Sequence, residues 1–583
     1  MTIAIHVSHE ATNKIGGIGS VLHGLIVAKK YKTIFPRTLL YSPLFNRDTG
    51  LSLKLGKDSD VLYSSLDQFD KGMWGETFSN IEKKYGVHIV YGKKRFYKEN
   101  SKRKYETVDI VAVDIWDMYP DVVNRFKYQL WEHFKIESNL YQNDNDYEQY
   151  LRIGVVLRDI YEALYGKNEK AALFSHEYMG MPSALAFQID KIEGRGKDDK
   201  TIFYAHEVST ARVVVENHPG HDFTFYNILN KDAKSGISLE EEFGSFSNYS
   251  RNELVKLASE LDFVFAVSDI VKDEFLYLCP DADKKKIKTV FNGIPRENVS
   301  FRDKKSSIKI IGEYCKDLFG FVPDHVFTHV TRLVVSKALW RDIRLLYHLD
   351  EFFRRKNKKG FFVLLSTLVG NGRNATDIEN MESEYGWPVV HKEGWPDLIS
   401  QEVDIYRYLE IFNAKSKAIK GIFINQFGFD HARTGKRVPK KASILSLRLA
   451  SDVEFGMSIY EPFGIAQLET LPYGGIPVLS AACGCASILQ KTMPKDEYLV
   501  INFADVPKSF KKRFKSKDDF INATKEERDS IETQICENSA KRLFDLLPND
   551  NKDRKKRFKL SKELSKALDW EHVAERIGKH LKP

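Results

Sequence analysis

The stretch Asp452–Glu469, DVEFGMSIYEPFGIAQLE, joins an apolar run, a Pro-Phe-Gly turn and two glutamates eight positions apart. The apolar run predicts a strand, and the residues that follow the turn predict a helix. Glu461 then lies on the loop after the strand, and Glu469 lies about one turn inside the helix. The backbone amides at the helix start are those of Phe463, Gly464 and Ile465. The two carboxylates can accept hydrogen bonds from the hydroxyls of two sugars, or they are an exposed turn residue and a first-turn acid favoured by the helix dipole.

The same alternation of strand, turn and helix recurs along the whole chain. Apolar runs that precede helical patterns lie at 2–7, 171–176, 201–207, 262–268, 288–294, 325–333, 360–367, 451–458 and 475–481. This pattern predicts an α/β fold with parallel sheets covered on both faces, and it lacks the eightfold regularity of a barrel.

A polar, lysine-rich run follows Thr289–Pro295 and predicts a domain boundary. We therefore expect two doubly wound, Rossmann-like domains, 1–300 and 320–560, with ligands at the carboxyl ends of the strands and in the cleft between the domains. The segment 561–583 predicts an amphipathic helix that docks on either domain and could cross back to the first.

Composition narrows the class of protein. The 583 residues are 42% hydrophobic and carry a net charge of +8, which favours anionic small partners and does not single out nucleic acid. The five cysteines form neither a disulfide framework nor a paired metal motif, and no run is long enough to cross a membrane. The first residues predict a strand rather than a leader peptide, so we expect a cytoplasmic protein. The lysine-rich stretches 508–517 and 552–558 are interpreted as solvated helix faces, with a polyanion or an anionic membrane as the alternative.

The glycine loop Asn13–Leu22, NKIGGIGSVL, follows the first strand and opens a helix. Gly16, Gly17 and Gly19 leave backbone N–H groups and the positive helix end open to an anion, and Lys14 adds a cation. A tight strand-to-helix turn without a ligand is an equally good interpretation of these glycines.

Two cations follow another strand, in Val330–Lys337, VTRLVVSK. Arg332 and Lys337 together suit a diphosphate, because a guanidinium fork and an ammonium point charge complement each other. The alternative is a pair of ordinary surface cations. His176 and His206 each end a strand and precede a glutamate, and strand ends of this kind line a crevice or hold a structural histidine.

Taken in order, these stretches resemble the glycogen and starch synthases and the wider class of retaining GT-B glycosyltransferases, and the motifs lie closest to the animal and fungal glycogen synthases. The glycine loop is similar to the K-x-G-G-[LI]-G pattern of that class, and the opening stretch is similar to its E-x7-E motif. The stretches that carry the resemblance are HEATNKIGGI (9–18), SHEYMGMP (175–182), AHEVSTAR (205–212), DFTFYNIL (222–229), TVFNGIP (289–295), TRLVVSK (331–337), EPFGIAQLE (461–469) and DWEHVAE (569–575).

The resemblance implies a role for each matching position. Arg332 and Lys337 would neutralise the departing diphosphate, and Glu461 would bind hydroxyls of the transferred sugar with the amides after it assisting. Glu469 would bind the ribose, and His176 would sit against the donor sugar. Lys14 and the glycine loop would approach the same phosphates. The residues implied to line the cleft on the acceptor side are His206, Arg212, Tyr226 and Asn227.

The resemblance further implies a hexosyltransferase that uses a nucleotide sugar, UDP-glucose by preference, with no metal ion and no bound cofactor. We expect a nucleotide sugar and a glycan as partners, and a homo-oligomer is compatible with this class. Ala211 and Ser20 depart from the usual Gly and Asp, and no arginine-dense helix is visible. Three hypotheses stay open: elongation of an α-glucan, transfer to a small sugar, sugar phosphate, lipid or protein, and a catalytically silent carbohydrate-binding or scaffold protein.

Overall fold

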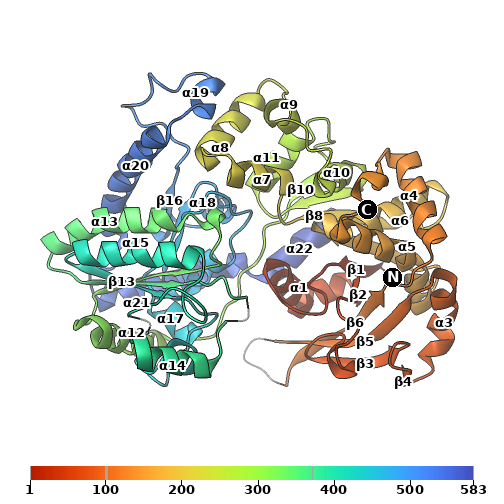
Figure 1. The fold of residues 1–583 in the computed structure, drawn as a ribbon, viewed down its shortest axis with the longest axis horizontal. Helices are drawn as coiled ribbons and strands as arrows, with labels where there is room; N and C mark the ends of the chain where they lie inside the picture. Colours follow the sequence, from red (N-terminus) through yellow and green to blue (C-terminus); the bar gives the residue numbers. More distant parts are fainter. Residues whose placement is uncertain (1, 99–102, 371, 388, 582–583) are drawn as a thin grey trace. The chain divides into compact units, whose positions relative to one another are not determined.

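The computed structural model describes residues 2–98, 103–370, 372–387 and 389–581. The chain divides into two compact units, each assembled from segments distant in sequence. Unit 1 comprises Met1–Val213, Asp232–Gly293 and Asp569–Pro583, and unit 2 comprises Val214–Lys231 and Ile294–Leu568 (Figure 1). The segment 214–231, inside the predicted first domain, thus packs with unit 2. The prediction of an active site in the cleft between the domains stays a prediction.

Unit 1 is built around a ten-stranded mixed sheet in the order β10-β9-β8-β7-β1-β2-β6-β5-β3-β4. The strands from β10 to β6 pair in parallel, and β5, β3 and β4 extend the sheet by antiparallel pairing, which the sequence pattern did not reveal. The strands are β1 Thr2–Val7, β2 Arg37–Pro43, β3 Ser59–Ser64, β4 Phe69–Asp70, β5 His88–Tyr97, β6 Tyr105–Asp114, β7 Lys170–His176, β8 Lys200–Ala205, β9 Phe263–Ala266 and β10 Ile287–Thr289.

Helices cover both faces of this sheet. In the sheet, β2 lies on one side of the β7–β1 pair and β8 lies on the other, so the connections from β1 to β2 and from β7 to β8 run in opposite directions. Because such connections are right-handed, α1 and α6 lie on opposite faces of the sheet. The helices are α1 Gly17–Val27, α2 Lys29–Ile34, α3 Trp74–Tyr85, α4 Pro120–Phe134, α5 Asn145–Tyr165, α6 Glu177–Ile192, α7 Ser209–Asn217, α9 Leu239–Phe243, α10 Ser250–Lys256, α11 Asp269–Leu278 and α22 Trp570–Leu581, with the last four residues of α7 in unit 2. Short 3₁₀ turns occur at Leu51–Leu53, Ser138–Tyr141 and Leu257–Glu260.

The helix α22 completes unit 1 from the other end of the chain. It packs on α1 and α2 and buries Val573, Ala574 and Ile577. The Trp570 ring lies so close to Gly24 that a Cβ there would stand 2.1 Å from it. The crossovers from β7 to β10 all run in one direction and leave part of one face bare, and α22 covers it. Of the predicted segment 561–583, residues 582 and 583 lie outside the described residues.

Unit 2 contains a six-stranded parallel sheet in the order β13-β12-β11-β14-β15-β16. Its strands are β11 His325–Val330, β12 Gly360–Leu365, β13 Ile419–Ile424, β14 Val453–Gly456, β15 Ile476–Ser480 and β16 Leu499–Ile501. Its helices are α8 His221–Asp232, α12 Phe301–Phe319, α13 Leu339–Arg355, α14 Ala375–Tyr385, α15 Gln401–Lys415, α16 His431–Thr434, α17 Ile444–Ala450, α18 Cys485–Thr492, α19 Lys517–Ile521, α20 Lys525–Leu546 and α21 Asn551–Leu564, with α8 ending one residue into unit 1.

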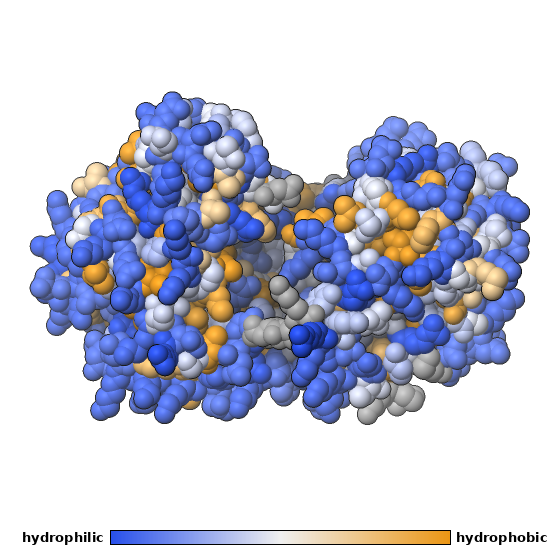
Figure 2. Space-filling model, turned by 90° about the horizontal axis from the view of Figure 1, so that it is seen from below, coloured by the Kyte–Doolittle hydropathy of each residue, from blue (hydrophilic) through white to orange (hydrophobic). Residues whose placement is uncertain are grey.

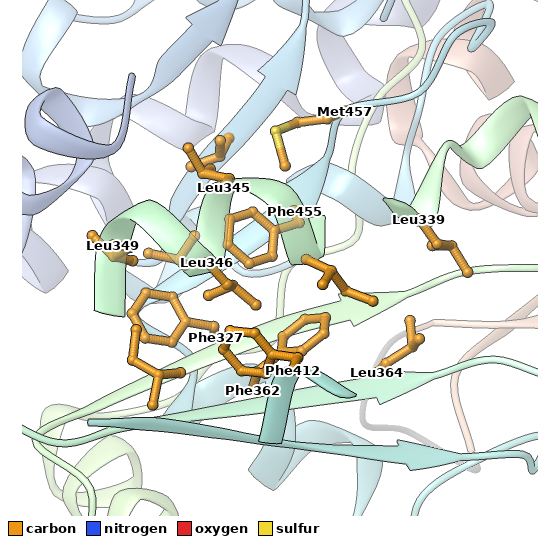
Figure 3. Packing of buried hydrophobic residues seen from close by; sticks show 14 of the residues in the cluster. Phe327, Leu339, Leu345, Leu346, Leu349, Phe362, Leu364, Phe412, Phe455 and Met457 are labelled. Atoms are coloured by element: carbon orange, nitrogen blue, oxygen red, sulfur yellow. The ribbon is translucent and has the colours of Figure 1, made fainter. Parts of the chain in front are cut away.

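Two apolar clusters lie on the two faces of this sheet. On one face, side chains of α13, α15 and α20 pack on the strands, and Figure 3 shows the rings of Phe327, Phe362 and Phe455 meeting the leucines of α13. On the other face, α12, α14 and α17 supply a second cluster around Trp387. A sheet buried on both sides explains why its strands read as continuous apolar runs.

The prediction of a helix after Ile465 is wrong in detail. The chain instead forms two 3₁₀ turns, Ala466–Leu468 and Leu471–Tyr473. Pro472 in the second turn lacks a backbone N–H, and Gly474 has φ +81°, so a continuous α-helix cannot form there. Other 3₁₀ turns in unit 2 are Val335–Lys337, Lys495–Glu497 and Ser565–Leu568.

The surface is dominated by polar residues. Figure 2 shows one face, on which hydrophilic residues surround scattered small apolar patches. Among the described residues, no helix combines the length and the hydrophobicity needed to cross a membrane.

Candidate functional site

In each unit the candidate residues follow the two strands at which the strand order reverses. In unit 2, β11 pairs with β14; Lys337 follows β11 and Glu461 follows β14. In unit 1, β1 pairs with β7; the glycine loop follows β1 and His176 ends β7. Such switch points are where doubly wound sheets bind ligands, at the carboxyl ends of the strands.

Lys337 and Glu461 form an ion pair. The Lys337 Nζ donates to Glu461 Oε2, and the amide of Gln467 donates to the same oxygen at 3.2 Å. The side chains of Lys337 and Glu461 are only 10% and 13% exposed, so the pair is largely removed from water. Two residues that lie 124 positions apart in the sequence are therefore joined in one ion pair.

Backbone hydrogen bonds hold this pair in place. The amide of Ile459 donates to the Ser336 carbonyl at 2.9 Å, which fixes the strand exit beside the lysine loop. The Phe463 carbonyl accepts from the amide of Cys485 at 2.8 Å, and Glu461 pairs with Cys483 as an isolated bridge. The loop that carries Glu461 is thus fixed on both of its sides.

Glu469 lies in a second charged group. Its carboxylate accepts from Arg448 at 2.6 Å, and Arg448 also pairs with the buried Glu454 at 2.8 Å. The side chain of Glu469 is 32% exposed, so it remains accessible to a hydroxyl while Arg448 orients it. Arg332, by contrast, is exposed on the loop after β11. The structure therefore places Arg332, Lys337, Glu461 and Glu469 on loops of one unit.

Arg341 is a residue that the sequence analysis missed. Its buried guanidinium donates to Asp222 at 2.8 and 2.9 Å, to Glu532 and to the carbonyl of Met457 at 3.3 Å, and it stacks 3.9 Å from the Phe503 ring. Burial raises the pKa of Asp222 despite this arginine. Arg341 thereby ties α8 and α20 to the strand exit that leads to the Glu461 loop. An arginine in the first turn of the helix after Lys337 is the sequence signal that could have indicated it.

The glycine loop of unit 1 already holds an anion, the carboxylate of Glu10. Its Oε2 accepts from the amides of Ile15, Gly16 and Gly19 at 2.9, 2.7 and 2.9 Å. A Cβ on Gly19 would stand 2.6 Å from the same oxygen, so the loop closes around the carboxylate. The predicted amide site for a ligand phosphate is therefore occupied from within the chain, although residues 13–17 are exposed at the surface. Glu10, five to nine residues ahead of these amides, was the signal in the sequence.

His176 does not offer a ring nitrogen to a ligand. Its Nε2 lies 2.8 Å from His6 Nδ1, and its Nδ1 lies 2.8 Å from His206 Nε2. The side chain is fully buried, and burial followed by the neighbouring histidines lowers its pKa well below the usual value. His6, a lone histidine in an apolar strand, was missed in the sequence.

Carboxylates follow His176 and His206. Buried Glu177 accepts from the amide of Glu207 at 2.7 Å, and its other oxygen has no hydrogen-bond partner among the described residues. Burial, then the charge of Glu207, raises the Glu177 pKa well above the usual value. Arg212 donates to Glu207 at 2.6 Å. His206, Arg212 and these glutamates therefore gather at the carboxyl edge of β7 and β8.

Tyr226 and Asn227 lie in unit 2 and not with the acceptor-side residues of unit 1. The Asn227 amide nitrogen donates to the carbonyls of Phe223 and Ala504 at 2.7 and 2.8 Å. Its role in this structure is to tie α8 to the loop after β16. The difference arises because the segment 214–231 leaves unit 1 and packs on unit 2.

No group of three or more His, Cys, Asp or Glu side chains that could hold a metal ion occurs in the described part of the chain. Asp144 of the DND triplet instead caps α5, accepting from the amides of Asp146 and Tyr147. Metal independence stays a prediction.

Comparisons with known proteins identify the fold. No family model and no curated protein matches the chain. Among solved structures, the chain is similar to the catalytic domain of starch synthase IV from Arabidopsis thaliana bound to ADP and acarbose, at 12% identity and a TM-score of 0.52, covering 100% of this chain and 98% of that one. A UDP-forming α,α-trehalose-phosphate synthase from Burkholderia xenovorans with glucose-6-phosphate gives 11% identity, full coverage of both chains and a TM-score of 0.48. The protein has the two-domain α/β fold of the GT-B glycosyltransferases, as the sequence predicted.

Proposed function

We propose that the protein is a retaining glycosyltransferase that moves a hexose from a nucleotide sugar to a glycan. Unit 2 binds the donor and unit 1 binds the acceptor. The observation that carries this proposal is the Lys337–Glu461 pair at the switch point of unit 2, with exposed Arg332 on the same loop. The fold that the chain shares with a starch synthase domain supports it.

The charged groups of unit 2 suit the chemistry of such a transfer. Arg332 and Lys337 supply positive charge for a departing diphosphate, which is the largest electrostatic demand of the reaction. Glu461, released from Lys337, accepts hydrogen bonds from hydroxyls of the transferred sugar. Glu469, oriented by Arg448, accepts hydrogen bonds from the ribose hydroxyls. The departing phosphate takes the proton of the acceptor hydroxyl, so the protein supplies positioning rather than a covalent nucleophile. In this proposal, Arg332 and Lys337 neutralise the charge of the diphosphate without a metal ion.

A neutral acceptor fits the carboxyl edge of unit 1 better than a sugar phosphate. Two arginines after its parallel strands are paired with carboxylates: Arg212 with Glu207, and Arg47 with Asp114 and Asp117. The unpartnered oxygen of Glu177 adds a further polar group that would repel a phosphate when ionised and bind a hydroxyl in either state.

Exposed aromatic rings at the same edge point to the same substrate class. Phe45 after β2 and Trp116 after β6 are 51% and 57% exposed. Their loops are joined, because Arg47 donates to Asp117 at 2.5 Å and pairs with Asp114. Exposed aromatic faces suit the apolar faces of sugar rings. We propose an α-glucan or a similar neutral polymer as the acceptor.

The test is nucleotide release from the purified protein with UDP-, ADP- and GDP-sugars, alone and with glycogen, malto-oligosaccharides or glucose 6-phosphate, alongside Glu461→Ala. We expect release from one glucose donor that rises with the neutral glucans and disappears in the variant. An increase of nucleotide release only with glucose 6-phosphate would indicate that the acceptor is a sugar phosphate. Binding of glucan without turnover of any donor would favour the silent scaffold.

Binding of UDP separates the roles of the two paired residues. Lys337→Met should weaken UDP binding about 10-fold or more, because the charge that meets the diphosphate is lost. Glu461→Gln should leave UDP binding unchanged or tighter, because Lys337 is released from its carboxylate, yet it should weaken UDP-glucose. Lys356→Met, at the exposed far end of α13, is the matched control for the loss of one positive charge.

A further inference from the structure

Four side chains of unit 1 form a continuous hydrogen-bonded chain. Tyr31 Oη lies 2.7 Å from His6 Nε2, His6 Nδ1 lies 2.8 Å from His176 Nε2, and His176 Nδ1 lies 2.8 Å from His206 Nε2. The hydroxyl of Thr38 lies 3.3 Å from the Tyr31 hydroxyl, at the buried end of this series of hydrogen bonds. His206 is the end at the carboxyl edge of the sheet and the one histidine of the three that is partly exposed.

The chain has only two arrangements in which every link is made. A neutral imidazole has one N–H donor and one bare acceptor nitrogen, so the tautomer of one ring dictates the tautomer of the next. Either Tyr31 donates to His6 and all three rings carry the proton on Nδ1, or Tyr31 donates to Thr38 and all three carry it on Nε2. Charging the rings is disfavoured, since burial lowers the pKa of His6 and of His206 to about 3.

We propose that Tyr31, His6 and His176 form a tautomer relay that fixes the second ring nitrogen of His206, its Nδ1, as an N–H donor. We assign the donor arrangement because the 2.7 Å contact of Tyr31 Oη with His6 Nε2 suits an O–H···N hydrogen bond, whereas Thr38 lies at 3.3 Å from the same hydroxyl. Tyr31, His6 and His176 are then positioning residues, and His206 is the residue that meets a hydroxyl oxygen of the sugar acceptor.

The role of His206 towards a sugar rests on the proposed function, but the relay itself does not. The relay predicts an unusual state of the free protein, because neutral histidine in water favours the Nε2–H form, whereas all three rings here carry Nδ1–H. It also predicts that a change at one end alters the tautomer of a ring that the changed residue does not contact.

The experiment is long-range ¹H–¹⁵N correlation of the histidine side chains in the free, full-length protein at pH 7. We expect His6, His176 and His206 to be neutral and all in the Nδ1–H form. In His206→Phe the acceptor for His176 Nδ1–H is gone, so His6 and His176 should both move to Nε2–H, with Tyr31 turning to Thr38. His9→Phe removes a neighbouring histidine that is not hydrogen-bonded to the relay among the described residues, so it should leave the tautomers of all three rings unchanged.

Mixed tautomers in the wild-type protein, or a His6 ring that ignores His206→Phe in a variant with wild-type circular dichroism, would overturn the relay. If that variant does not fold, the tautomers of the three rings in the wild-type protein still test the relay. In a transferase assay, Tyr31→Phe should raise the KM for the glycan several-fold and leave donor hydrolysis unchanged. Confirmed tautomers without any transfer would refute the proposed function and leave the relay standing.

Discussion

The ion pair between Lys337 and Glu461 allows a quantitative test on the free protein. At an effective dielectric constant of about 20, unit charges about 4 Å apart attract by about 4 kcal/mol, and the cost of removing both groups from water cancels most of that gain. The side chains of Lys337 and Glu461 are only 10% and 13% exposed, so both groups have lost much of their hydration. We therefore expect a net coupling free energy of about 1–3 kcal/mol.

The single variants should differ in their cost. Glu461→Gln leaves the ammonium of Lys337 buried without a carboxylate, which typically costs about 3 kcal/mol or more. Lys337→Met leaves Glu461 with the amide of Gln467 at 3.2 Å, so it should cost less. The double variant should be less destabilised than the sum of the two single variants.

The assay is urea unfolding of the four proteins without nucleotide, with hydrogen exchange of β11 and β14 assigning the transition to unit 2. A coupling free energy near zero would refute the reasoning, because it would mean that water screens the pair as it screens a surface salt bridge. Lys356→Met, made in the wild type and in Glu461→Gln, serves as the control cycle and should show no coupling.

Three further predictions concern unit 1. Gly24→Ala drives a methyl group into the Trp570 ring and should cost about 1–3 kcal/mol and speed hydrogen exchange in α22, whereas Gly50→Ala, where the added Cβ meets nothing within 4 Å, should not. Glu10→Ala exposes three amides at a helix start; we expect a loss of about 1–2 kcal/mol that added sulfate partly restores, and a variant indifferent to sulfate would contradict the anion-like role of the carboxylate. The folded-state pKa of His6, about 3, lies below its unfolded value of about 6.5, so the unfolded chain binds the extra proton between these values. Stability should fall as pH drops from 6.5, by roughly 1.4 kcal/mol per pH unit for this ring, and His6→Phe should flatten the pH dependence between 6 and 4.5.

The sequence predicted most of the strands that are buried on both faces, although β2 and β13 were not among the runs named. The runs that end at His176 and begin at His325 are rich in apolar residues because helices cover both sides of the sheets, and this pattern is visible without a structure. The fold and the positions of Lys337 and Glu461 at strand exits followed from it. The short antiparallel strands β3 and β4 carry weaker patterns at the edge of the sheet and were not predicted.

Side-chain partners could not be predicted, because they depend on strand order. The pairing of β1 with β7 brings His6 beside His176, 170 positions away, and nothing in either stretch indicates the other. The loss of the helix after Ile465 has a local cause, Pro472 and the positive φ of Gly474, which a periodicity argument does not detect.

Both candidate anion sites of the protein are filled by its own carboxylates, and the two differ in how a ligand can use them. Glu10 accepts three backbone hydrogen bonds inside a closed loop, so removing it would open the loop and is costly. Glu461 holds Lys337 through one ion pair and keeps a second donor in the side chain of Gln467. In the proposed function, a nucleotide diphosphate therefore replaces Glu461 as the partner of Lys337, and the carboxylate binds the sugar. A donor complete with its sugar offers partners to both members of the pair, whereas the nucleotide alone offers a partner to only one. If the proposed function is correct, the pair itself gives a preference for an intact donor over its product, and Glu461→Gln should reduce this preference.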